Sequence, residues 1–134
     1  MSELIEMEYK SLLNKKPELL YNGEYDGYEY YITSMGSHPC AYIIIEPDDD
    51  LFGKSCDELS IIPAHGGINY ATTSLGDWVK DKWVIGWDYM RYGDYNGFTG
   101  EIEMEFGREL KKWSTEEIME DIIKNINFIN SLKK

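Results

Sequence analysis

The stretch Cys40-Ala41-Tyr42-Ile43-Ile44-Ile45-Glu46 is apolar at almost every position and ends in consecutive β-branched residues before its final Glu. Successive side chains of a strand point to opposite faces, so such a run has an apolar side chain on both faces. We therefore predict a strand in a central position, covered on both sides. The segment Pro47-Asp48-Asp49-Asp50 that follows is typical of a turn and ends the strand.

Two segments before this strand, residues 18–25 and 28–34, are typical of a hairpin. Two dipeptides could form its turn, Asn22-Gly23 and Asp26-Gly27, because both readily adopt the positive φ that tight hairpins need. The sequence does not choose between them. Still earlier, residues 3–16 have apolar side chains every three or four positions, which predicts a helix that ends at Pro17.

Beyond the central strand we expect short strands at Leu59–Ile62 and Ile68–Thr72, and a longer one at Lys82–Arg91. One face of this longer strand is core-like and carries Trp83, Ile85, Trp87 and Tyr89. The other face puts Gly86 beside Asp88, where a ligand or another backbone could approach closely. Alternating Glu and apolar residues at 101–106 could form a half-buried strand or the start of a helix, and we favour a strand or an irregular segment.

The segment Ser114-Thr115-Glu116-Glu117 is a capping box, which predicts the start of a helix. Apolar residues then recur at spacings of three and four up to Ile129, so one stripe of this helix faces a core and the helix ends near residue 132. The expected fold is α+β: a mainly antiparallel sheet of five to six strands, with an N-terminal helix and a C-terminal amphipathic helix packed on it. We expect a single domain, residues 1–134.

The composition excludes several classes of partner. The chain has 134 residues and a net charge of −12, which opposes the phosphate contacts of general DNA or RNA binding. No apolar run is long enough to cross a membrane, and the start Met1–Glu6 is acidic, unlike a signal peptide, so we expect a cytoplasmic protein. Cys40 and Cys56 should then be free thiols.

The turn His65-Gly66-Gly67 is the strongest candidate for a site. Its glycines could expose backbone N–H groups to an anionic or polar ligand, with His65 as a further donor; the alternative is an ordinary tight turn. Asp88, Arg91 and Asp94 could contact the same ligand, or form a salt bridge and a turn. A third alternative is a metal site formed by Asp88 and Asp94 with His38 or His65. The predicted ligand-binding residues are His65, Gly66, Gly67, Asn69, Tyr70, Trp87, Asp88, Arg91 and Asp94.

Several short sequence motifs, taken in their order along the chain, resemble those of a family of small phage and prophage proteins. They are Ser37-His38-Pro39-Cys40-Ala41-Tyr42, Leu51-Phe52-Gly53-Lys54 after Pro47, Ala64–Tyr70, Gly86-Trp87-Asp88 and Gly93-Asp94. The family usually carries Cys and His between the last two of these motifs, where this chain has Tyr89-Met90-Arg91-Tyr92. The resemblance implies a phage setting, and that departure turns the expectation away from a metal site.

We favour a non-catalytic binding protein that sequesters a small polar or nucleotide-derived ligand, by analogy with phage proteins that counter bacterial immune signals. No cofactor-binding or catalytic motif is present, so we expect no cofactor and no metal. Two alternatives remain: a small hydrolase in which His65 is the acid or base and Asp88 its partner, and an acidic inhibitor that docks residues 17–50 on a basic host protein. A homo-oligomer is also left open.

Overall fold

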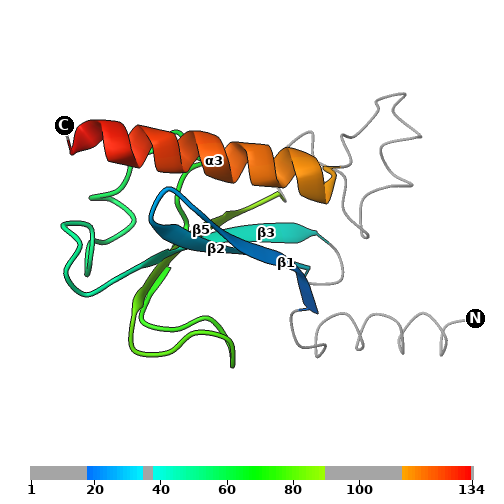
Figure 1. Ribbon diagram of the computed structural model, residues 1–134, viewed down its shortest axis with the longest axis horizontal. Helices are drawn as coiled ribbons and strands as arrows, with labels where there is room; N and C mark the ends of the chain where they lie inside the picture. Colours follow the sequence, from blue (N-terminus) through cyan, green and yellow to red (C-terminus); the bar gives the residue numbers. More distant parts are fainter. Residues whose placement is uncertain (1–17, 35–37, 90–112, 134) are drawn as a thin grey trace, which may run out of the picture.

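The computed structural model describes residues 18–34, 38–89 and 113–133 (Figure 1). The predicted helix at 3–16, the segment at 101–106 and the candidate site residues Arg91 and Asp94 lie outside these ranges. The elements in chain order are β1 (Glu18–Tyr25), β2 (Tyr28–Ser34), β3 (Pro39–Ile45), β4 (Tyr70–Thr72), β5 (Trp83–Asp88) and the helix α3 (Thr115–Leu132).

The described strands form one sheet in the order β1-β2-β3-β5-β4, and every neighbouring pair is antiparallel. The predicted central strand is confirmed, since β3 lies between β2 and β5, with Ile43 opposite both Tyr30 and Ile85. The expectation of a mainly antiparallel sheet with a C-terminal helix is therefore correct for the described residues.

The hairpin turn is Asp26-Gly27, whose φ values are 47° and 91°. Tyr25 pairs with Tyr28 across it, so the connection has two residues, as the positive φ values of such turns require. The other candidate, Asn22-Gly23, lies inside β1 and is paired along the strand. The structure thus resolves the ambiguity that the sequence left.

Each face of β3 has its own cover. On one face, α3 lies across β1, β2 and β3 (Figure 1), and its apolar stripe completes the larger core. The buried residues of this stripe are Ile118, Ile122, Ile126 and Ile129. On the other face, Tyr42, Ile44 and Val84 pack against Leu75 and Val79 of the segment between β4 and β5.

The prediction of a strand at Leu59–Ile62 is wrong. This segment is a succession of turns, in which the Leu59 amide donates to Ser55 O at 3.0 Å and the Ile62 amide donates to Leu59 O at 3.0 Å. Leu59 and Ile62 are both buried in the larger core, because a spacing of three puts them on the same side of a turn. The next strand, predicted from Ile68, begins at Tyr70.

The two ends of α3 are held differently. At its start the predicted capping box is present: the Ser114 hydroxyl accepts from the Glu117 amide, and the Glu117 carboxylate accepts from the Ser114 amide. Just after its end, Lys133 donates to Asp49 at 2.8 Å and contacts the Tyr28 hydroxyl, which donates to the same carboxylate at 2.5 Å.

Within the described ranges, no helix has the length and apolar character needed to cross a membrane.

The anchor at the end of α3 depends on charge. Burial alone would raise the pKa of the Asp49 carboxyl, but hydrogen bonds from Lys133, Tyr28 and the Leu51 amide outweigh burial and lower this pKa. Burial would likewise lower the pKa of Lys133, yet its hydrogen bonds to Asp49 and Tyr28 raise it to about 12. Both shifts favour the charged forms, so the ion pair stabilises the folded chain at neutral pH.

We expect Asp49→Asn to lower the free energy of unfolding by about 1 kcal/mol at pH 7, because a charge-assisted interaction between a half-buried carboxylate and an exposed amine is lost. The Asp49 pKa is lower in the folded than in the unfolded chain, so this contribution is present above the unfolded pKa of about 4 and disappears as pH falls through the folded value. Urea unfolding at several pH values measures it. Asp50→Asn, at an exposed neighbour, is the control; equal effects of both substitutions would contradict the anchor.

Gly86 generates a second prediction. A Cβ placed there would meet the Tyr42 ring and would lie 2.6 Å from Ala41 O, so the close approach predicted at this glycine is made by the protein itself. Gly86→Ala should therefore destabilise the fold by about 1–3 kcal/mol through overpacking. Gly53→Ala shows the cost of backbone strain alone, since a Cβ there meets nothing within 4 Å but φ is +82°. If urea unfolding shows Gly86→Ala to be as stable as the wild type, this packing argument fails.

Candidate functional site

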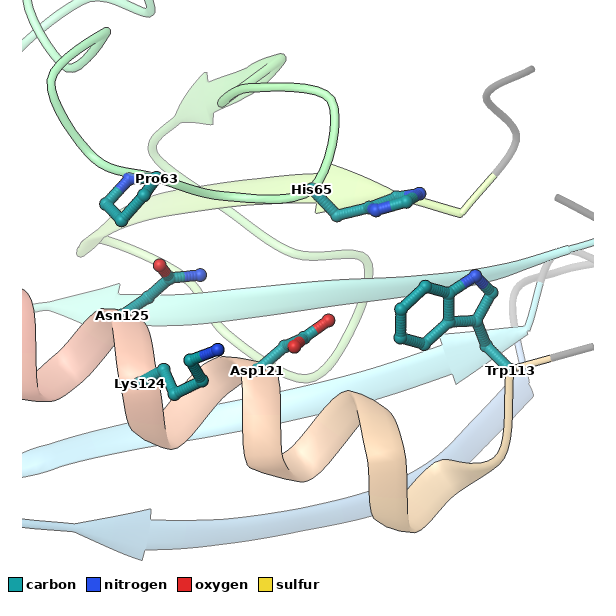
Figure 2. A pocket seen from close by; sticks show the side chains of 6 residues that line it. All are labelled: Pro63, His65, Trp113, Asp121, Lys124 and Asn125. Carbon is teal, nitrogen blue, oxygen red and sulfur yellow. The ribbon is translucent and has the colours of Figure 1, made fainter. Parts of the chain in front are cut away.

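The turn at His65 begins the site. Gly66 and Gly67 have φ values of 72° and 87°, in the left-handed region that favours glycine, and the Gly67 amide donates to Ala64 O at 2.9 Å. This tight turn follows Ala64, which is buried in the larger core. The consequence is that the half-buried His65 side chain faces the layer that contains α3 (Figure 2).

Three aromatic rings meet at this point. The His65 ring is stacked on Tyr89, with centroids 4.8 Å apart and planes at 13°. Trp113, just before the helix cap, lies edge-on to His65 at 5.0 Å and is tilted against Tyr89 at 4.9 Å. These contacts join the turn, the end of β5 and the start of α3, which are far apart in the sequence.

A hydrogen-bonded chain runs from the core to the same place. The Trp87 indole donates to the Tyr89 hydroxyl at 3.0 Å, and this hydroxyl donates to Asp121 Oδ2 at 2.8 Å. Trp87 is 1% exposed and Tyr89 is 0% exposed, so neither can exchange its partner for bulk water. The Asp121 carboxylate is therefore held in a fixed position by buried groups behind it.

Between the turn and α3 lies a cleft of about 240 Å³ (Figure 2). Drug-sized pockets are commonly about 300–1,000 Å³, so this cleft suits a smaller group. Its lining combines aromatic, charged and amide side chains. These are Pro63, His65, Trp113, Asp121, Lys124 and Asn125.

Asn125 is the most buried polar group of this lining, with 3% of its surface exposed. It occupies a position in the apolar stripe of α3, and its carboxamide points toward the space below Pro63 (Figure 2). Among the described residues, this carboxamide is not one of the fully enclosed polar groups without a partner, so it keeps contact with the cleft. Its donors and acceptor are thus available to whatever enters the cleft.

The residues predicted from the sequence are divided between the two faces of the sheet. His65 lines the cleft, Gly66 and Gly67 shape its turn, and Trp87 supports it from behind through Tyr89. Asn69 and Tyr70 have other partners. Asn69 donates to Asp88 Oδ2 at 2.7 Å, while Tyr70 donates to Ser74 O at 2.7 Å.

Asp88 faces away from the cleft because it lies between Trp87 and Tyr89 on a strand, where side chains alternate. Its charge acts on His38 and Cys40 on the opposite face of the sheet. Burial lowers the pKa of His38, and the nearby Asp88 only partly opposes this. Burial also raises the pKa of the Cys40 thiol to about 11, which agrees with its interpretation as a small buried hydrophobe.

Five lining residues were not among the predicted ones: Pro63, Trp113, Asp121, Lys124 and Asn125. One signal for them exists in the sequence. Asn125 stands three residues after Ile122 and seven after Ile118, where the stripe of an amphipathic helix calls for an apolar residue. Asp121 lies one helical turn before it, on the same side of α3.

Comparison of the chain with protein-family models, with curated protein sequences and with solved structures found no match.

The hydroxyl of Tyr89 can be tested directly. Tyr89→Phe should destabilise the fold by about 1–3 kcal/mol, because the buried Trp87 indole loses its acceptor and Asp121 loses its donor. Urea unfolding followed by tryptophan fluorescence measures the change. Tyr25→Phe removes a hydroxyl whose bond to Asn127 is exposed and should cost less; a larger loss from Tyr25→Phe would contradict the role given to Tyr89.

Proposed function

We propose that this chain is a non-catalytic binding protein, which holds a small, polar, ring-containing ligand between the His65 turn and α3. The observation that carries the proposal is the cleft itself, where aromatic rings, a fixed carboxylate and a buried carboxamide meet. Aromatic walls stack planar rings, and a few placed polar groups then fix the orientation of a ligand.

The charge of the protein favours a ring over a phosphate as the part that enters the cleft. The chain has a net charge of −12, and Asp121 adds a carboxylate to the lining. Lys124 is exposed and provides the lining's positive charge at its rim. A nucleotide-derived ligand would therefore place its base inside and keep any phosphate near Lys124 or in water.

Sequestration needs tight binding alone, which agrees with an absence of catalytic motifs in the sequence. The hydrolase alternative paired His65 with Asp88, and these side chains belong to opposite faces of the sheet. The resemblance to phage proteins supports a counter-defence role in the cytoplasm of a host cell, where the protein would act as a sponge for a nucleotide-derived immune signal.

The site predicts the behaviour of matched variants. His65→Ala and Trp113→Ala should each weaken retention of a co-purified ligand by tenfold or more, since stacking of a base on an aromatic ring contributes ~1–3 kcal/mol. Native mass spectrometry of freshly purified protein reports the retained mass, and calorimetry with the ligand released by heating gives the affinity. His38→Ala is the control, because His38 lies on the other side of the sheet.

Two results would reject the proposal. Equal retention by the wild type and by both cleft variants would place the ligand elsewhere. Release of a chemically altered ligand after incubation with intact nucleotides would show turnover, and would make the protein an enzyme rather than a sponge.

A further inference from the structure

Asp121 and Asn125 form a polar pair in the cleft. They are four residues apart on α3, so their side chains are neighbours, about 5–6 Å apart at Cβ. Asn125 is 3% exposed and lines the cleft, so the cleft is where its carboxamide can find a hydrogen-bond partner. The pair thus presents hydrogen-bonding groups that a bound molecule would satisfy.

The pair has a defined pattern of donors and acceptors. The Tyr89 hydroxyl receives the Trp87 N–H and commits its one proton to Asp121 Oδ2. Asp121 lines the cleft and keeps acceptor capacity on both carboxylate oxygens, since Oδ2 has a second lone pair, while Asn125 offers both an N–H₂ donor and a carbonyl acceptor. An ionised carboxylate attracts groups with two neighbouring N–H donors most strongly.

Among the common nucleobases, guanine matches this pattern. Its edge carries a ring N–H and an exocyclic amine side by side, followed by a carbonyl oxygen that could accept from the Asn125 amide. Adenine has a ring acceptor at the corresponding position, which a carboxylate repels. Uracil has a single N–H between two carbonyl oxygens and leaves one side of the carboxylate facing an acceptor.

The geometry points to a guanine-type ring as the ligand of the cleft, read by Asp121 and Asn125 and stacked against His65 or Trp113. This inference rests on the proposed function, because it requires that the cleft binds a ring. It adds the chemical class of that ring and gives Tyr89 the role of a positioning residue for Asp121. Aromatic stacking with hydrogen bonds to the base edge is a usual mode of recognising unpaired bases.

Calorimetry with the 5′-monophosphates of guanosine, inosine and adenosine tests the inference on the full chain. The phosphate and ribose are the same in all three, so differences in affinity come from the ring. Inosine lacks the exocyclic amine and should bind roughly tenfold to a hundredfold more weakly, as expected for the loss of one hydrogen bond to a charged group. The adenosine nucleotide should bind more weakly still.

Asp121→Asn should remove the preference between the guanosine and inosine nucleotides, since the carboxylate acceptor is lost. The Asn side-chain oxygen can still accept from Tyr89, so the fold should persist, and a thermal melt verifies this. Glu120→Gln, at the exposed neighbouring position on α3, makes the same change of charge outside the lining and should keep the preference.

The outcomes separate this inference from the one on which it rests. Binding of all three nucleotides with equal affinity, lost in His65→Ala, would overturn the guanine-type specificity and keep the cleft as the binding site. Binding of none of them would overturn both. A preference for guanosine that persists in Asp121→Asn would show that another group reads the ring.

Discussion

The burial of β3 on both faces is the constraint on which the rest of the structure depends. Each side chain from Cys40 to Ile45 is at most 8% exposed, so the sheet must be covered twice. The helix α3 covers one face, and the segment between β4 and β5 covers the other. Apolar burial contributes about 25 cal/mol per Å². Leaving either face uncovered would expose apolar surface to water and remove a large part of the free energy that drives folding.

The cover on both faces also determines which side chains of β5 lie near the cleft and which lie on the opposite face of the sheet. Because side chains alternate along β5, Trp87 and Tyr89 point toward the helix, while Asp88 points toward the opposite face with Cys40. A contiguous motif such as Gly86-Trp87-Asp88 therefore contributes side chains to both faces of the sheet. Side chains that are adjacent in the chain are here separated by the pleat of the strand, so proximity in the sequence does not place them in one site.

The local features of the fold were predictable from the sequence. The central strand, the hairpin and the capping box are each encoded by residues that are near one another, and all three are present. Leu59–Ile62 was not predictable, because a short apolar run has no period that separates a strand from a turn. His65 was identified as a lining residue, but Asp121 and Asn125 were not, since their proximity to it depends on how α3 crosses the sheet.

The position of the cleft follows from how α3 is held. Its capped start carries Trp113 against His65 and Tyr89, and its far end is fixed to β2 and the turn after β3 through Lys133. A helix fixed at both ends keeps Asn125 in its apolar stripe, where the carboxamide reaches solvent through the cleft. An apolar residue at that position would leave no polar group there to be satisfied. Asn125 instead places a polar group in the cleft beside the carboxylate that Tyr89 holds, which supports the proposal that the cleft binds a ligand.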